Sequence, residues 1–450
     1  MNITKANFNN VFKNISFKQK QKSNKINLSQ QALPCKQDVS SEFFKQYLIG
    51  VENWQNKTSK AAPVNFENDF NNLETINLKN NLQVVFDPCP DNDTTSMEFE
   101  LYPEKDYNPN SAVAILLANI LNQDLELINQ PGSSNDYENM RVVIEPSKKV
   151  FISLYSKPEH TLEKSGKLLN TIFNLNISQE KLDNAKSKII ENLSEYPQDR
   201  VQSLLNGYES YKKEDIERVS LSDIEGFYNE LKANSMGKCV VSLPSTTYKD
   251  EKEKIINLFE NTIPNLKPYN YANIKDTIVI PDKPITVEHG KSQNIERYYA
   301  IKDNNTLKNA VTYKIIEKAL NNALAKSTNE YQHIGCTRSG SDFSKYYVLY
   351  AKGNPSSEET IKLMDAAIKE LTDKQLTPYD FEKAKTQTKS ERINENNGSS
   401  SRARILTETY DDGDCSIKSF VATLNAITAN DVWQKAQKYF STPPITNILE

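Results

Sequence analysis

The sequence is poor in histidine, the residue that most often binds transition metals. Only three histidines occur in 450 residues, and none has a second histidine three to five residues away. They are His160, His289 and His333. A pair of histidines one helical turn apart, the usual core of a helical zinc site, is therefore excluded. We interpret each of the three as a surface or loop histidine.

Cysteine is also scarce, and long apolar runs are absent. The five cysteines are single and widely spaced, and they are Cys35, Cys89, Cys239, Cys336 and Cys415. This odd number without C-x-x-C spacing favours a reducing compartment over a disulfide framework. The longest apolar run ends near Leu121 and is much shorter than the roughly 18 residues of a membrane span. We expect a cytoplasmic protein without a transmembrane segment, with the mitochondrial matrix as the alternative.

Acidic residues are missing from the N-terminal part of the chain. Residues 1–37 contain seven lysines and no Asp or Glu, so the formal net charge of −4 leaves −11 for the rest. An acidic body argues against nucleic-acid binding. Residues 1–70 are polar and weakly periodic, which predicts a basic, largely disordered leader. Contact of this leader with a membrane or an acidic partner is the alternative.

Regular patterns begin near residue 72. Residues 73–78 and 82–86 alternate apolar and polar side chains around Lys79-Asn80-Asn81, which predicts a β-hairpin. Residues 112–121 are apolar on all sides and predict a buried helix. Further strands are predicted at 97–102 and 150–155, and further helices near 160–175 and 179–196.

The sequence contains an internal repeat. Two helices open alike at Ile177-Ser178 and Leu376-Thr377, which are 199 residues apart. Farther along, Val219-Ser-Leu-Ser-Asp-Ile matches Ile427-Thr-Ala-Asn-Asp-Val at an offset of 208. Ser220 and Thr428 are predicted helix N-caps, each with an Asp three residues later. A predicted strand follows each of these helices, at 239–243 and 445–449, and the strand at 150–155 matches 346–350.

The repeat predicts an α+β fold with two homologous domains. Each domain is expected to be an antiparallel sheet with helices packed on one face. The first spans residues 72–263 and the second residues 286–450. Four prolines mark a linker at 264–285, and they are Pro264, Pro268, Pro281 and Pro284.

This order of elements resembles the pitrilysin/insulinase-type metallopeptidases, the family of the mitochondrial processing peptidase. The resemblance covers residues 72–450, close to one two-domain subunit of that family. It rests on the repeated helix opener followed by a strand, and on the acid- and Lys-rich helix at 178–195 with its echo at 377–392. It implies two curved domains that face each other and enclose a cavity.

Active members of the family carry H-x-x-E-H on a buried helix, with a third zinc ligand, a Glu, on a later helix. The resemblance assigns the two His positions to Ile115 and Asn119, the first Glu to Ala118 and the third ligand to Asn192. Ile has no lone pair, Asn is a poor zinc ligand and Ala cannot accept a proton. We therefore predict no metal, no cofactor and no catalytic residue. No G-x-S-x-G motif supports a serine nucleophile instead.

Two further family landmarks concern substrate binding. The turn Gly132-Ser133-Ser134-Asn135 and the strand at 140–144 resemble the segment that pairs with substrate backbone, and an ordinary turn is the competing interpretation. In the second domain, many relatives hold substrate with an Arg and a Tyr seven residues later. Here Ala325 or Lys326 stands near the Arg position, ahead of Tyr331.

The leading hypothesis is a catalytically inactive homologue that pairs with an active zinc peptidase or binds an extended peptide or protein segment. Strand addition at an open sheet edge would supply the binding energy through backbone hydrogen bonds. A purely structural subunit of a larger assembly and a residual metalloendopeptidase are the two alternatives.

Overall fold

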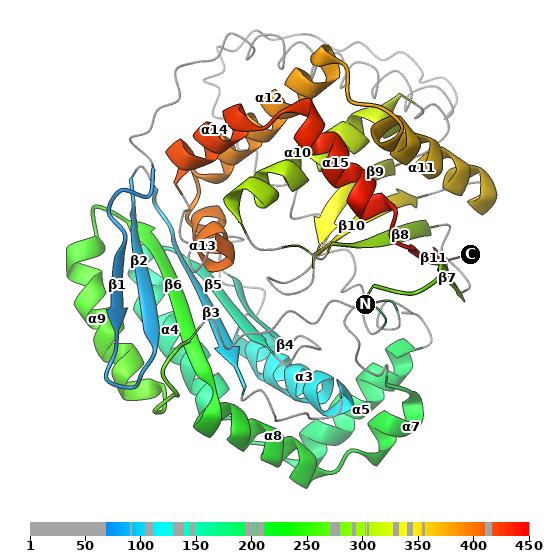
Figure 1. Ribbon diagram of the computed structural model, residues 1–450. Helices are drawn as coiled ribbons and strands as arrows, with labels where there is room; N and C mark the ends of the chain where they lie inside the picture. The colour runs from blue at the N-terminus through cyan, green and yellow to red at the C-terminus, as the bar shows by residue number, and fades with distance from the viewer. Residues whose placement is uncertain are drawn as a thin grey trace, which may run out of the picture. The chain divides into compact units, whose positions relative to one another are not determined.

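Two β-sheets, one from each half of the chain, carry the helices of this protein (Figure 1). The computed structural model describes residues 69–449, except for some short segments. The segments left out are 91, 104–110, 129–138, 145–148, 194–200, 202–203, 205–210, 271–279, 290–293, 302, 304–305, 327–332, 340–344, 353–355 and 410–415. The predicted leader therefore lies outside the described residues.

The first sheet has six strands in the order β1-β2-β6-β3-β5-β4. The strands are β1 (Glu74–Asn77), β2 (Gln83–Cys89), β3 (Thr95–Tyr102), β4 (Asn139–Ile144), β5 (Val150–Ser156) and β6 (Met236–Pro244). All pairs are antiparallel except β2 with β6. β4 pairs with β5 alone and forms one edge of the sheet.

The predicted hairpin is confirmed as β1 and β2. The amide of Leu78 donates to the carbonyl of Leu82, with 2.9 Å between N and O. Asn81 takes the left-handed backbone conformation, with φ of 64°, which asparagine tolerates better than most residues. The side chain of Asn80 donates to the carbonyls of Phe259 and Ile263, at 3.0 and 3.1 Å. The turn is thereby held to a helix from the end of the first half.

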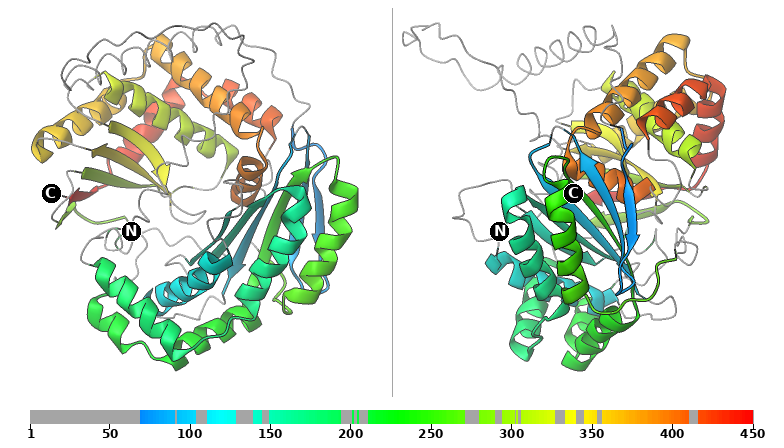
Figure 2. Two further views of the ribbon diagram at one scale, coloured as in Figure 1. Left: turned by 180° about the vertical axis from the view of Figure 1, so that it is seen from behind. Right: turned by 90° about the vertical axis from the view of Figure 1, so that its left-hand side faces the viewer.

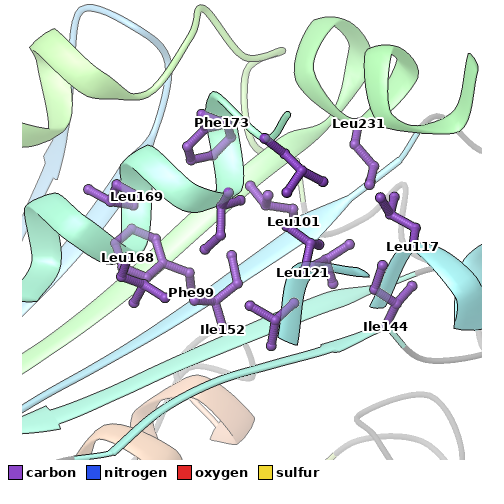
Figure 3. Close-up of a cluster of buried hydrophobic side chains, with 14 of the residues drawn as sticks. Phe99, Leu101, Leu117, Leu121, Ile144, Ile152, Leu168, Leu169, Phe173 and Leu231 are labelled. Atoms are coloured by element: carbon purple, nitrogen blue, oxygen red, sulfur yellow. The ribbon is translucent and has the colours of Figure 1, made fainter. Parts of the chain in front are cut away.

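One face of the first sheet carries a hydrophobic core beneath a layer of helices (Figure 3). Alternation along β3 directs Met97, Phe99 and Leu101 into this core, where each is at most 2% exposed. The helices are α3 (Ser111–Ile128), α4 (Pro158–Phe173), α5 (Gln179–Leu193), α7 (Lys213–Arg218), α8 (Leu221–Asn234) and α9 (Tyr248–Thr262). Full burial of each large apolar side chain contributes about 1.5–3 kcal/mol.

The second sheet has five strands in the order β7-β11-β8-β10-β9. They are β7 (Ile285–His289), β8 (Asn294–Ile301), β9 (His333–Ser339), β10 (Lys345–Lys352) and β11 (Ile445–Leu449). Only β7 and β11 run parallel, and β9 forms an edge. The two sheets thus each combine an antiparallel ladder with one parallel pair, and both include the closing strand of their half.

The second hydrophobic core lies between this sheet and most helices of the second half. The helices that line it are α10 (Leu307–Ala325), α11 (Ser357–Thr372), α12 (Pro378–Glu395), α14 (Ile417–Ala426) and α15 (Ala429–Phe440). The remaining helix, α13 (Ser399–Thr409), packs elsewhere. The predicted N-caps are confirmed at α8 and α15. Asp223 N donates to Ser220 Oγ at 3.3 Å, and Asp431 N donates to Thr428 Oγ1 at 3.1 Å, each within a capping box.

Each half also packs a segment against the sheet of the other half. Helix α13, shown in orange-brown in Figures 1 and 2, contacts β2, β3 and β6 on the face opposite the first core. Conversely, Val201 of the first half is fully buried against second-sheet residues that include Tyr298 and Val348. Of the predicted linker, Leu266 and Lys267 are bound to the first half, because their amides donate to Asn80 O and Ser235 O.

Candidate functional site

The helix that the sequence assigned to a degenerate zinc motif is α3. Its Ala-, Leu- and Ile-rich sequence has strong helix propensity, and the helix extends seven residues past Leu121. Leu116, Leu117 and Ile120 are fully buried in the first core. Ile115, Ala118 and Asn119 are only partly buried. Their spacing of three and four residues places these three side chains on one strip of the helix.

The side chains on this strip offer no catalytic group. Ile115 and Ala118 pack against the margin of the first core. Asn119 Oδ1 accepts a hydrogen bond from Gln123 Nε2 at 3.1 Å, so its best ligand atom is already engaged. A zinc site needs three protein ligands with lone pairs and an open position for water. These three residues supply neither a strong ligand nor a proton acceptor.

Helix α5, which carries the predicted third position, packs beside α3. Leu182, Ala185 and Ile189 enter the same core, and Lys181 Nζ lies 2.7 Å from Asp124 Oδ2 of α3. Asn192 belongs to α5, and its side chain lies outside the described residues. The structure therefore brings together the two helices that the resemblance singled out.

Metal ligands do not gather elsewhere in the described part of the chain. Over those residues, no group of three or more His, Cys, Asp or Glu side chains is arranged to hold an ion. His160 lies in the first turn of α4, and His333 begins β9 with an exposed side chain. His289 ends β7. Within the described residues, the cysteines Cys89, Cys239 and Cys336 are buried.

The strand predicted at 140–144 is present and lies at a sheet edge. It is β4, which runs antiparallel to β5 with Val142 opposite Ile152. The turn Gly132-Ser133-Ser134-Asn135 lies outside the described residues. On β4, Val142 N donates to Asn122 Oδ1 at 3.3 Å, and Asn122 Nδ2 donates to Val142 O at 2.8 Å. A side chain of α3 therefore binds both backbone polar groups of a residue on the edge strand.

The second half contains the same arrangement. Cys336 of the edge strand β9 donates its amide to Asn321 Oδ1 at 2.7 Å, and Asn321 Nδ2 donates to Cys336 O at 2.8 Å. Asn321 lies on α10, which corresponds to α3. Sequence reasoning did not single out Asn122 or Asn321. Their separation of 199 residues, equal to the offset of the earlier helix opener, was the available signal.

The region assigned to substrate holding in the second half is partly described. Ala325 ends α10, and Lys326 follows it as the C-cap. Lys326 Nζ lies 2.7 Å from Glu370 Oε1, and this interaction raises the pKa of Lys326. Residues 327–332, including Tyr331, lie outside the described residues.

Charged side chains occupy the face of the first sheet that contacts α13. Glu100 of β3 pairs with Lys149 and lies 3.4 Å from Lys238 Nζ, and it accepts a hydrogen bond from Tyr102 Oη at 2.8 Å. Burial raises the pKa of Glu100, but the charges of the two lysines lower it by more than burial raises it. The pKa of Glu100 therefore lies below its ordinary value. Lys238 Nζ also donates to Thr407 O of α13 at 3.0 Å.

Glu98 stands two residues before Glu100 on the same face of β3. It is 6% exposed, and its Oε2 has no hydrogen-bond partner within the part of the chain that the structure describes. Burial, followed by the negative charges of Glu408 and Glu100, raises the pKa of Glu98 to about 8. This carboxyl therefore keeps its proton at neutral pH.

No family model and no curated protein matches this sequence. Solved structures do match. A protease from Helicobacter pylori is 15% identical with a TM-score of 0.66, covering 84% of this chain and 99% of the other. The inactive M16 peptidase domain from Pseudomonas fluorescens is 11% identical with a TM-score of 0.59, covering 84% and 97%. A chain in the structure of complex III2 from Candida albicans with Inz-5 bound is 12% identical with a TM-score of 0.62, covering 83% and 95%.

The fold is that of the M16-like peptidases. This observation confirms the predicted pitrilysin-type fold and its α+β class with two sheets. The M16-like fold occurs both in a protein described as a protease and in a domain described as inactive, so the fold alone does not decide catalysis. Within the described residues, no helix of this chain is both long and apolar enough to span a membrane.

Proposed function

We propose that this chain is a catalytically inactive M16-like subunit that binds an active zinc peptidase of the same fold. The observation that carries the proposal is the partly buried strip of α3. Ile115 and Ala118 pack against the core, and Asn119 is bonded to Gln123. Zinc hydrolases activate water on a metal held by three ligands, and this strip offers none of the strong ones.

The remaining features support a binding role. The chain has two sheets, with β4 and β9 each at an edge, and each half packs on the other, so that together they form an extensive folded frame. The domain from Pseudomonas fluorescens has the same fold and is described as inactive. A frame of this kind without catalytic groups is suited to holding a partner protein or an extended polypeptide.

Copurification tests this proposal. The full chain, carrying an affinity tag, is expressed in its source cells, and the proteins that elute with it are identified by mass spectrometry. We expect a relative that carries H-x-x-E-H to elute in roughly one-to-one amount, as in a stoichiometric heteromer. Recovery of the chain alone, with no such relative, would count against the proposal.

A purely structural role within a larger assembly is the second candidate. It is favoured by the similarity to a chain in the structure of complex III2. Deletion of residues 1–70 separates the two candidates. A structural role that uses the leader predicts loss of assembly, while pairing through the folded frame predicts that the partner is still recovered. A structural role of this kind would favour the mitochondrial matrix, which is the alternative to a cytoplasmic location.

Residual peptidase activity is the competing proposal. Zinc measured by mass spectrometry, together with a cleavage assay on a generic peptide, decides between the two. We expect no stoichiometric zinc and no cleavage. Cleavage that a chelator abolishes would replace the proposed binding role with a metalloendopeptidase.

A further inference from the structure

The same pairing of helix and edge strand occurs at the edge of each sheet. Asn122 on α3 binds Val142 of β4, and Asn321 on α10 binds Cys336 of β9. In both cases one amide accepts from the strand N–H and donates to the C=O of the same residue. In an antiparallel sheet, the N–H and C=O of one residue point toward the same neighbouring strand. Because the amides take both groups, these groups turn away from β5 and β10.

An added strand would bind those outward groups. Strand addition uses the N–H and C=O of alternate edge residues, and each such residue forms two hydrogen bonds with the incoming backbone. Val142 is the fourth of six residues in β4, and Cys336 is the fourth of seven in β9. Each asparagine amide, which has the same donor and acceptor as a peptide group, therefore stands in for an added strand near the middle of its edge.

Both amides are held in place by their surroundings. The second N–H of Asn122 Nδ2 donates to the carbonyl of Ala118 at 2.8 Å, so three of the four hydrogen-bonding positions of this amide are used. At the other edge, Gly335 leaves room for Asn321. A Cβ at Gly335 would lie 3.1 Å from Asn321 Oδ1 and 2.8 Å from Tyr350 Oη, closer than ordinary contacts. The same Asn-to-backbone arrangement at both edges indicates that it belongs to the duplicated structural unit.

We propose that Asn122 and Asn321 gate the edges of the two sheets, so that an extended polypeptide pairs with β4 or β9 only where it displaces the amide. This gate would regulate the proposed binding role, and its function in the cell rests on that proposed role. It also explains how the edge strands β4 and β9 avoid pairing with unrelated strands. The partner that it fits is an extended backbone able to offer its own N–H and C=O groups at these positions.

Peptide binding to the full chain tests the gate. The probe is a fluorescein-labelled peptide of alternating threonine and valine, and the control probe has proline at every second position, which removes strand donors. Binding is followed by fluorescence anisotropy for the wild type, Asn122→Ala and Asn321→Ala. Each variant frees one N–H and one C=O for the probe, so we expect about tenfold tighter binding of the alternating peptide. The proline probe should show no gain.

The matched control is Asn170→Ala on α4. Asn170 is exposed, and its side chain accepts from Asn174 at 2.9 Å without touching an edge strand. This variant should bind the probe as the wild type does. Asn122→Ser, which keeps a polar side chain too short to span both groups, guards against a variant that fails to fold, and circular dichroism melts check each protein.

The outcomes separate this inference from the proposed function. If neither alanine variant binds the probe better than the wild type and Asn170→Ala, or if binding weakens, the gate is wrong. Failure to recover a peptidase partner in the copurification leaves the probe assay unaffected, because that assay uses the isolated chain. Faster hydrogen exchange of the Val142 and Cys336 amides in the variants would show that the freed groups face solvent.

Discussion

Arg402 and Asp87 form a two-pronged ion pair in the interior of the protein. Arg402 Nε lies 2.7 Å from Asp87 Oδ2, and Arg402 Nη2 lies 2.5 Å from Asp87 Oδ1. Ser242 Oγ also donates to Asp87 at 2.7 Å, and the guanidinium lies 4.2 Å from the centre of the Phe70 ring. The pair joins α13 of the second half to β2 of the first half. It therefore couples the two halves directly.

We expect Asp87→Ala to lower the free energy of unfolding by about 3–5 kcal/mol, because removal of one partner leaves the other charge buried and uncompensated. Both side chains are at most 2% exposed, so water cannot replace the lost partner. Urea unfolding followed by circular dichroism measures the change. Glu163→Ala, which removes the exposed pair with Lys167, is the control and should have no measurable effect. Equal stability of the two variants would contradict the coupling.

Stability should fall as pH rises toward 8 because of Glu98. Its pKa is about 8 in the folded protein against an ordinary value of 4.5. Between these values the folded state holds a proton that the unfolded state releases, so the stabilising contribution is complete below about pH 4.5 and is lost as pH rises through 8. The whole effect is on the order of 4–5 kcal/mol, since each unit of pKa shift corresponds to about 1.4 kcal/mol.

Glu98→Gln tests this dependence, because Gln resembles the protonated carboxyl and does not titrate. The free energy of unfolding of the variant minus that of the wild type should grow by about 1 kcal/mol per pH unit from pH 5 to 8. Glu163→Gln, at an exposed position, should show a flat difference between pH 6 and 8. A flat difference for Glu98→Gln would mean that the carboxyl is ionised in the folded protein.

Most of the secondary-structure elements could be predicted from local sequence patterns. The hairpin around Asn80 and the caps at Ser220 and Thr428 depend on neighbours a few residues away, and the structure confirms them. The repeat then ordered these elements into two similar halves. One parallel pair in each sheet was not foreseen, because it joins β2 to β6 and β7 to β11 across most of a half.

The contacts that join the two halves and those that shape the candidate site depend on long-range packing. Arg402 and Asp87 are 315 residues apart, and no local pattern relates them. Asn122 looked like an ordinary polar position on a helix, since its partner Val142 follows 20 residues later on a different element. By contrast, the sequence alone excludes Ile115 and Ala118 as metal ligands, because neither side chain has an atom that can bind a metal ion.

The two repeated caps should contribute similar stability. We expect Ser220→Ala and Thr428→Ala each to lower the free energy of unfolding by about 1 kcal/mol, because each leaves an amide of the first helical turn without its acceptor. Urea unfolding of the two single variants and the double variant measures the effect. The sites lie in different halves, so the double variant should lose about the sum. A much larger loss at one site would show that this cap also supports tertiary packing.

The assignment of the zinc positions is open to a constructive test. Replacing Ile115 and Asn119 with His, Ala118 with Glu and Asn192 with Glu should create a site that holds roughly one zinc ion per chain after dialysis, because three ligands on α3 and α5 would converge. Mass spectrometry of the metal content measures this, with the wild type expected to retain none. The control variant keeps every change except Asn119→His, and it should lose the ion because only one His and one Glu ligand remain. If the full variant folds and still binds no zinc, the register assigned to α3 or the position assigned on α5 is wrong, and the argument that these residues replace a former catalytic site fails with it.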